Sequence, residues 1–229
     1  QRFVVTRARL VVAPSNYFKR VVAGWGVDPN RLIHIYLGLD VVIETAQPPT
    51  PLPVQRTFCT AGRLVPWKGT DLVLDLLCDL PEWQAVIIGD GPQLRALTDR
   101  AAALGVADRV RFTGRLSPAE VLGWCTAADA FVLNTSFESF SFQVLEAMAS
   151  GIPVITTNIG SLPELITDGV EGVLCTPGDR SAFTAALMSV EEEPDVWKQR
   201  TDVAKRKAAT FSESASAHAF IQAIKNLCT

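Results

Sequence analysis

The sequence has no long apolar run and no excess of either charge. Its 229 residues are 48% hydrophobic. The longest apolar stretches are nevertheless strand-sized and flanked by turn residues, so we expect no transmembrane span or signal peptide in it. The formal net charge is only −3, which argues against a general nucleic-acid binder. The chain is long enough to bury one large core or two small ones.

Metal-binding patterns are also missing. The two histidines, His34 and His218, are isolated, whereas a zinc site needs several ligands at close spacing. We expect no metal site and structural or surface roles for both histidines. No two cysteines form a C-x-x-C pair, and Cys59 and Cys175 lie in apolar runs, which predicts buried free thiols. Such thiols fit a reducing, cytoplasmic setting. The five cysteines are Cys59, Cys78, Cys125, Cys175 and Cys228.

Strand-like and helix-like segments alternate regularly in the larger part of the chain. This spacing predicts βαβ crossovers and an α/β fold in which helices cover both faces of a parallel sheet. The candidate strands are residues 57–61, 85–88, 109–112, 130–133, 153–156 and 172–174. The helical patterns between them are 71–79, 93–104, 118–127, 142–149 and 162–167. Further on no strand is evident, and helices are expected at 182–190, 194–209 and 212–227.

The first residues have a shorter pattern of their own. An apolar strand-like segment, 10–13, leads to Ser15, which is suited to cap a helix over 16–25, and an extended segment follows at 31–36. The chain begins with Gln1 rather than methionine. Because its first residues already have the character of an approach to a strand, we interpret the chain as a piece of a longer protein.

Two carboxylates eight positions apart, Glu138 and Glu146, are the most informative feature of the sequence. They follow the apolar strand 130–133, so that Glu138 lies in a loop and Glu146 about one turn into a helix. Such a junction is where open α/β sheets bind ligands. One carboxylate can face a sugar while the other accepts hydrogen bonds from a vicinal diol, which indicates a nucleotide sugar. The alternatives are a surface salt bridge for Glu146 and helix capping for Glu138.

Arg63 and Lys68 place two cations after the first strand of the regular pattern, beside a helix that begins near Thr70. The guanidinium, the ammonium and the free backbone N–H groups of a helix start all attract anions. A diphosphate fits there, and fixed cations can stabilise its negative charge as it departs, without a metal. The alternative is a pair of solvated loop charges. We interpret Trp67 as a packing residue.

Two glycine turns follow the next two strands. They are Gly89-Asp90-Gly91-Pro92 and Gly114-Arg115-Leu116. A glycine turn lets a ligand approach the backbone closely, although most such turns are only turns.

In this order the motifs resemble the C-terminal domain of retaining glycosyltransferases with the GT-B fold, family 4 (group 1). The resemblance covers about residues 56–229 and includes the E-x7-E element of Glu138 and Glu146. It implies a Rossmann-like, doubly wound parallel sheet with helices on both faces. The other matching segments are Gly62-Arg63, Lys68-Gly69, Gly89 to Pro92, Ala147 to Val154, Gly160 to Glu164 and Asp168 to Gly172.

The resemblance also implies a division into domains. Residues 1–45 are expected to be the end of an N-terminal acceptor domain, with Leu37-Gly38-Leu39-Asp40 in place of the usual Asn-Gly-Val-Asp. The proline-rich segment 46–55 has no periodic apolar pattern and is expected to be a linker. Residues 56–229 are expected to form the donor-binding domain, whose final helix crosses back to the N-terminal domain.

Roles for individual residues follow from the same resemblance. Arg63 and Lys68 would bind the donor diphosphate, Glu146 the ribose hydroxyls, and the backbone around Arg115 and Leu116 the base. The catalytic candidates are Arg63, Lys68 and Glu138. The donor-binding candidates are Arg63, Lys68, Gly89, Gly91, Arg115, Leu116, Ser139, Phe140, Ser141, Phe142 and Glu146.

The sugar-binding loop departs from the family pattern. Glu138 and the backbone of Ser139 to Phe142 would hold the donor sugar. The family usually has glycine where this chain has Ser139 and Ser141. Serine adds a Cβ and a hydroxyl, so it either changes the geometry of the sugar site or supplies an extra hydrogen bond.

The function implied is sugar transfer from a UDP-, GDP- or ADP-sugar to a glycan or glycolipid, with retention at the anomeric carbon and without metal or other cofactor. The leaving diphosphate would deprotonate the acceptor, so no enzyme nucleophile is required. The alternatives are a non-catalytic nucleotide-sugar binding module and a nucleotide-sugar epimerase of the same fold.

The expected partners and location depend on the domain that is missing here. It would hold most of the acceptor site and any surface for peripheral membrane contact, so the chain by itself is expected to be inactive. No nucleic acid is expected as a partner. Lipopolysaccharide or other polysaccharide biosynthesis, in the cytoplasm or at the inner face of the membrane, matches the commonest uses of the family.

Overall fold

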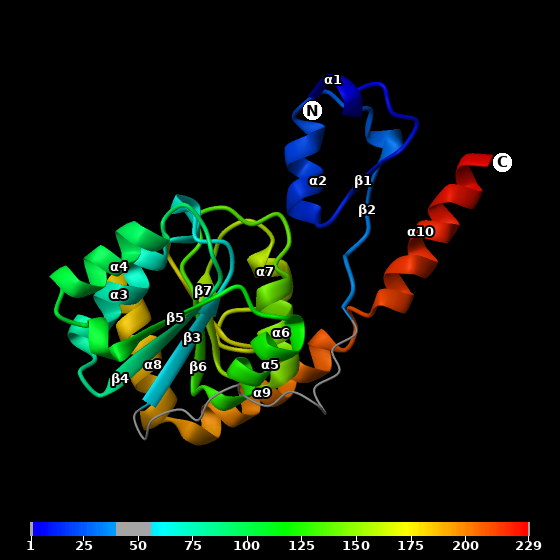
Figure 1. Cartoon of the computed structure of the whole chain (residues 1–229). Coiled ribbons are helices and arrows are strands. Elements are labelled where there is room, and N and C mark those ends of the chain that lie inside the picture. Colours follow the sequence, from blue (N-terminus) through cyan, green and yellow to red (C-terminus); the bar gives the residue numbers. More distant parts are fainter. Residues whose placement is uncertain (1, 40–55, 229) are drawn as a thin grey trace.

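The computed structural model of the protein describes residues 2–39 and 56–228 (Figure 1). The predicted linker, 46–55, and Asp40 lie outside the described residues.

A six-stranded parallel sheet forms the centre of the larger part of the molecule (Figure 1). The spatial order is β5-β4-β3-β6-β7-β8. The chain therefore enters in the middle at β3, builds out to β5 at one edge, and returns to the other side of β3 to build out to β8. This confirms the doubly wound parallel sheet. The strands are β3 (Arg56–Ala61), β4 (Trp83–Ile88), β5 (Val110–Gly114), β6 (Ala130–Leu133), β7 (Val154–Thr157) and β8 (Val173–Cys175).

Helices cover both faces of this sheet (Figure 1). One face carries α3 (Thr70–Asp79), α4 (Leu94–Ala103) and α8 (Arg180–Glu192). The other carries α5 (Pro118–Ala127), α6 (Phe142–Ser150), α7 (Leu162–Leu165) and most of α9 (Pro194–Ala208). These elements agree with the predicted ones to within a few residues at their ends.

Successive residues of each strand pack into opposite hydrophobic clusters. Phe58 and Ile87 pack with α3, α4 and α8, whereas Cys59 and Val86 pack with α5 and α6. Side chains alternate in this way along any strand, and a parallel sheet covered on both sides buries both sets. The predicted burial of Cys59 and Cys175 as free thiols is confirmed.

The N-terminal segment, residues 2–39, forms a small unit with its own apolar cluster of Val22, Val27 and Leu32. Its elements are α1 (Arg2–Val5), β1 (Val11–Ala13), α2 (Asn16–Ala23), η1 (Pro29–Arg31) and β2 (Leu32–His34), with β1 and β2 paired in parallel.

The first residues lead to a strand as expected, since β1 follows them, but residues 2–5 form the short helix α1 on the way to it. The hydroxyl of Thr6 donates to the carbonyl of Arg2, and the Arg7 guanidinium lies 3.6 Å from the centre of the Phe3 ring. These local contacts favour a helical turn over the extended backbone that the sequence of valines prefers.

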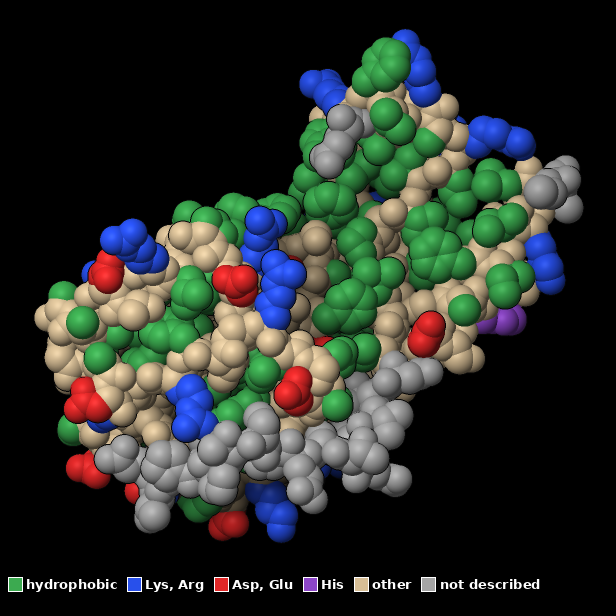
Figure 2. Space-filling view, in the orientation of Figure 1, with side chains coloured by type: hydrophobic (Ala, Val, Ile, Leu, Met, Phe, Trp, Pro, Cys, Tyr) green, Lys and Arg blue, Asp and Glu red, His purple; other side chains and the backbone are tan. Residues whose placement is uncertain are grey.

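The last helix, α10 (Glu213–Cys228), leaves the sheet and runs beside the N-terminal segment (Figure 1). Ser216 donates to the carbonyl of Tyr36 at 2.7 Å, and Arg9 donates to the carbonyl of Leu227 at 3.0 Å. Figure 2 shows hydrophobic side chains along both of these parts. Ile221 and Ile224 of α10 are about half exposed. None of the described helices is long and apolar enough to cross a membrane.

Arg109 lies at the end of η3 (Ala107–Arg109), and its side chain binds the connection between α3 and β4. Its guanidinium donates to the carbonyls of Leu77 at 2.8 Å, Leu80 at 3.0 Å and Trp83 at 2.9 Å. All three residues are buried where α3 ends and β4 begins.

Replacing Arg109 by alanine is therefore expected to destabilise the protein by about 2–3 kcal/mol, because these carbonyls lose a charged donor. Urea unfolding of Arg109→Ala measures the change in the free energy of unfolding. Arg95→Ala removes an exposed arginine from α4 and is the control. Equal effects of the two substitutions would contradict the role given to Arg109.

Candidate functional site

A cavity of about 620 Å³ opens at the carboxyl ends of β3, β4 and β5, beside α6. It brings together residues from four separate segments of the chain. These ends meet at one edge because the strands are parallel, and the site lies next to the reversal of strand order between β3 and β6. The predicted site residues that line the cavity are Arg63, Gly89, Gly91, Arg115, Leu116 and Glu146.

The floor of the cavity is backbone. Gly62 donates to the carbonyl of Ile88 at 2.9 Å, and Gly89 donates to that of Gly114 at 2.9 Å, so the ends of three strands are joined. Gly89 has φ +134°, and a Cβ there would lie 1.9 Å from the carbonyl oxygen of Gly62. Only glycine allows this close approach of the two backbones.

Glu146 lines the cavity from the inner part of α6. Burial raises the pKa of its carboxyl from 4.5 to about 7. Among the described residues no side chain pairs with this carboxyl, and the hydrogen bond from Ser150 goes to the backbone carbonyl of Glu146, so the alternative of a surface salt bridge finds no support in the described part of the chain. A partly buried carboxylate that faces a cavity is suited to accept hydrogen bonds from a ligand.

Arg63 follows β3 and is exposed at the rim of the cavity. No acidic side chain of the described ranges pairs with it. Its guanidinium can therefore bind an anion without first leaving a partner.

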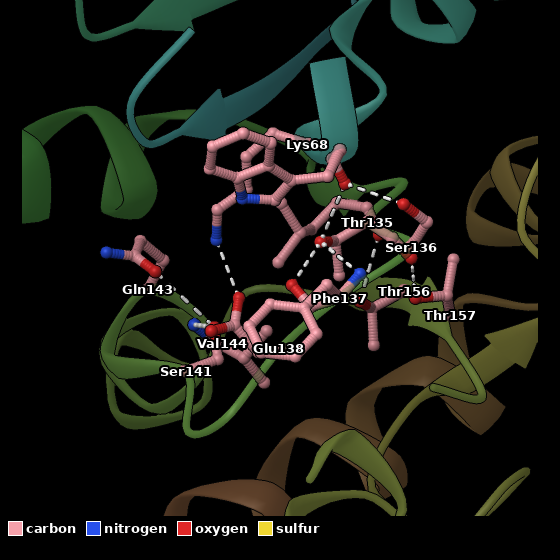
Figure 3. Close-up of polar contacts among 12 residues, drawn as sticks. Lys68, Thr135, Ser136, Phe137, Glu138, Ser141, Gln143, Val144, Thr156 and Thr157 are labelled. Atoms are coloured by element: carbon pink, nitrogen blue, oxygen red, sulfur yellow. Dashed lines mark hydrogen bonds and ion pairs between the residues drawn. The ribbon is translucent and has the colours of Figure 1, made fainter. Parts of the chain in front are cut away.

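Lys68 and Glu138 form an ion pair beside this cavity, with 2.6 Å between Nζ and Oε2 (Figure 3). Lys68 ends the short helix η2 (Pro66–Lys68), and Glu138 is only 8% exposed. Two hydrogen bonds hold their loops together, because the carbonyl of Trp67 accepts from the hydroxyl of Thr135 at 3.0 Å and from the amide of Ser136 at 2.8 Å. The two loops that carry the pair are thus held together at the carbonyl of Trp67.

Ser141, and not Glu138, caps α6. Its hydroxyl accepts from the amide of Val144 at 3.4 Å, and its φ is −110°. The alternative role of Glu138 as a helix cap is therefore wrong. No non-glycine residue in the described part of the chain has positive φ, so serine is accommodated at 139 and 141 without backbone strain.

The loop 139–142 does not line the large cavity. The carbonyl of Ser139 accepts from the hydroxyl of Ser15 at 2.6 Å. The ring of Phe140 is buried, with its centre 5.6 Å from Phe142 and 6.3 Å from Tyr36. This loop therefore lies between the cavity and the N-terminal segment.

Sequence reasoning overlooked some residues of the site and misjudged one. Gln143 and Asp90 also line the cavity. Gln143 precedes Glu146 by three positions and so shares its helix face, which is a signal that the sequence contains. Trp67 is not a packing residue, because its side chain is 48% exposed.

The described residues contain no group of three or more His, Cys, Asp or Glu side chains that could hold a metal ion. His34 is half-buried, and its Nε2 lies 3.3 Å from the side-chain nitrogen Nδ2 of Asn16. His218 is exposed.

A six-stranded doubly wound parallel sheet with helices on both faces is the fold of GT-B glycosyltransferase domains. Residues 42–210 match the model of a family described as glycosyl transferases group 1. The chain belongs to this family, and the GT-B resemblance is confirmed.

Relatives in sequence include two bacterial enzymes. The lipopolysaccharide core biosynthesis mannosyltransferase LpsB of Rhizobium meliloti (strain 1021) is 29% identical over 99% of this chain and 68% of its own length. A glycogen synthase of Mycobacterium tuberculosis (strain ATCC 25618 / H37Rv) is 36% identical over 64% of this chain and 36% of its own length. The chain thus spans only part of the relatives it matches.

Solved structures show the same fold. Anabaena Alr3699/HepE in complex with UDP-glucose superposes with a TM-score of 0.89 at 23% identity, over 98% of this chain and 66% of that one. The lipopolysaccharide outer core galactosyltransferase WaaB, in its apo form, gives a TM-score of 0.75 at 29% identity, over 96% and 62%.

The buried Glu146 carboxyl predicts a pH dependence of stability. Folding raises its pKa from 4.5 to about 7, so the folded protein binds more protons than the unfolded chain between these values. The contribution of the protonated Glu146 carboxyl to the free energy of unfolding is fully present at the acidic end of this window. It is lost as the pH rises through the pKa of the folded state.

Chemical unfolding of the wild type and of Glu146→Gln across this window is the measurement. We expect the free energy of unfolding to decline with pH in the wild type and to decline less in the variant, whose side chain cannot ionise. Identical slopes would mean that this carboxyl titrates with an ordinary pKa.

Proposed function

We propose that the intact protein transfers a sugar from a nucleoside-diphosphate sugar to a glycan or glycolipid acceptor, with retention at the anomeric carbon. The observation that carries the proposal is one cavity that joins Arg63 and Glu146, beside the Lys68–Glu138 pair. These are the groups that a diphosphate, a ribose and a sugar each require.

The nucleoside would bind in the cavity over the glycine floor. The Glu146 carboxylate would accept hydrogen bonds from the two ribose hydroxyls, since each O–H group donates and an ionised carboxylate offers two acceptor oxygens. The backbone around Arg115 and Leu116 would contact the base.

The diphosphate would bind between Arg63 and Lys68. Lys68 has three N–H donors, of which one is directed at Glu138, so the others are available. The start of α3 has no side-chain cap, and its free backbone amides add a third attractive group for an anion.

Glu138 and the backbone of residues 139–142 would hold the donor sugar. One carboxylate oxygen of Glu138 pairs with Lys68. The other would accept a hydrogen bond from a sugar hydroxyl. Because Glu138 is nearly buried, closure over the sugar would strengthen this bond by excluding water.

In the transfer step the bond between the sugar and the diphosphate breaks, and a bond from the acceptor oxygen forms on the same face. The acceptor proton passes to the leaving diphosphate, whose growing charge Arg63 and Lys68 stabilise. Neither an enzyme nucleophile nor a metal is needed for this balance.

Donor and acceptor would bind to different domains. Residues 56–229 would bind the donor, while residues 1–45 would end a domain that binds the acceptor, and the chain by itself would not catalyse. LpsB and WaaB are named for lipopolysaccharide synthesis. By analogy we propose a surface glycan or glycolipid acceptor, and a cytoplasmic site of action at the inner face of the membrane.

Calorimetric titration of this chain with UDP, GDP and ADP in the presence of a chelator tests the donor site. We expect saturable binding of one nucleotide, and at least a tenfold weaker affinity in Glu146→Gln, because one acceptor for the ribose hydroxyls becomes a donor. Binding that needs a divalent metal would contradict the metal-free proposal.

Turnover of the intact protein tests the cations. Arg63→Ala and Lys68→Ala are each expected to lower kcat by about 10²–10³-fold, as loss of one electrostatic contact to a transition state does. The control is Lys198→Ala, which removes an exposed lysine of α9. Unchanged turnover in both site variants would refute their role.

Product analysis with the intact protein separates the candidate functions. A glycoside with the anomeric configuration of the donor supports retaining transfer, and one with the opposite configuration contradicts it. An epimerised donor would indicate the epimerase, and binding without any product the non-catalytic module.

A further inference from the structure

Glu164 of α7 lies outside the cavity, and its carboxylate binds the start of α2 in the N-terminal segment. Oε1 accepts from the amide of Tyr17 at 2.6 Å, and Oε2 accepts from the amide of Asn16 at 2.9 Å. These are the first two amides of α2, which have no acceptor within their own helix. A carboxylate at this end also interacts favourably with the helix dipole.

Ser15 makes a second connection from the same helix start. Its side chain is fully buried, and its hydroxyl accepts from the amide of Phe18 at 3.1 Å, which caps α2. The same hydroxyl donates to the carbonyl of Ser139 at 2.6 Å. The cap of α2 is therefore bonded directly to the residue that follows Glu138.

A third connection closes the arrangement. The amide of Ser161 donates to the carbonyl of Glu138 at 3.1 Å, and a Cβ at Gly160 would lie only 2.2 Å from that oxygen. The segment that leads into α7 thus packs directly on the backbone of Glu138. The start of α2, the Glu138–Ser139 peptide and the 160–164 segment form a closed ring of hydrogen bonds.

Tyr36 adds two further hydrogen bonds to this closed arrangement. Its hydroxyl donates to Glu164 at 2.8 Å and accepts from the Asn16 side chain at 3.0 Å. Burial, together with the hydrogen bond to Glu164, raises the pKa of Tyr36, so the hydroxyl remains protonated and keeps donating. Its ring centre lies 6.3 Å from that of Phe140 in the sugar loop.

We propose that Glu164 and Ser15 are positioning residues, which hold Glu138 and Ser139 in the geometry that binds the donor sugar while the N-terminal segment is docked on α7. This inference rests on the proposed function. Separation of α2 would break the bonds of Glu164 and Ser15 together and release the sugar loop. The nucleotide groups, Arg63 and Glu146, belong to segments outside the ring and would be unaffected.

The first experiment needs no ligand. Hydrogen exchange of the intact protein is measured for the wild type and Glu164→Gln, in which an amide N–H replaces one of the oxygens facing backbone donors. We expect residues 15–18 and 138–142 to lose protection together. If 15–18 alone loses protection, the coupling that we propose does not exist.

The matched control is Glu171→Gln. Glu171 is also a buried carboxylate, which accepts from the amide of Thr167 at 2.7 Å and pairs with Lys207 at 3.2 Å, and neither of these partners lies in the N-terminal segment. It is expected to leave the protection of 138–142 unchanged. An equal loss in both variants would mean general loosening and would overturn the proposal.

The second experiment measures what the sugar adds to binding, as the ratio of the affinities for the nucleoside-diphosphate sugar and the bare nucleoside diphosphate. Glu164→Gln should lower this ratio by about tenfold and leave the affinity for the bare nucleotide within about twofold. Tyr36→Phe keeps the ring, loses one of the bonds to Glu164, and should have a smaller effect of the same kind.

The outcomes separate this proposal from the proposed function. If the wild type binds no nucleotide, the proposed function fails, and the exchange experiment still decides whether the ring couples α2 to the sugar loop. An unchanged ratio in Glu164→Gln overturns the positioning role even where transfer itself is found. If Glu164→Gln does not fold, Tyr36→Phe carries both measurements.

Discussion

The reversal of strand order between β3 and β6 is the constraint on which the rest of the site depends. Because β3 and β6 are neighbours, the loop that follows each of them leaves the sheet at the same edge. One loop carries Lys68 and the other Glu138, so residues 70 positions apart form an ion pair at 2.6 Å. With the nearby cavity formed at the ends of β3, β4 and β5, both halves of the sheet contribute to one place.

The parts of the fold and the site that recur locally in the sequence could be predicted from it. Apolar strands of regular spacing gave the sheet, and the spacing of Glu138 and Glu146 fixed one residue in a loop and the other on a helix. The order of the motifs identified the family. The strand spacing and the spacing of the two glutamates are relations between residues close in the chain, which a periodic pattern records.

The parts that depend on contacts distant in sequence could not be predicted. Nothing near Lys68 indicates that Glu138 is its partner. The exposure of Trp67 depends on how its loop is held against Thr135, 68 positions further along the chain. The bonds of Glu164 to α2 likewise join residues more than a hundred positions apart.

The path of α9 has a consequence for how the larger part of the molecule loses its structure. Trp197, near the start of this helix, belongs to the cluster on one face of the sheet, while Ala204 and Ala208, near its end, belong to the cluster on the other. The helices on the two faces of the sheet therefore share α9, and unfolding of either layer removes contacts of α9 with the other layer. The small cluster of the N-terminal segment has no such shared helix. Cooperativity should accordingly be high across the sheet and its two layers, with the N-terminal segment joined to them as a less strongly coupled unit.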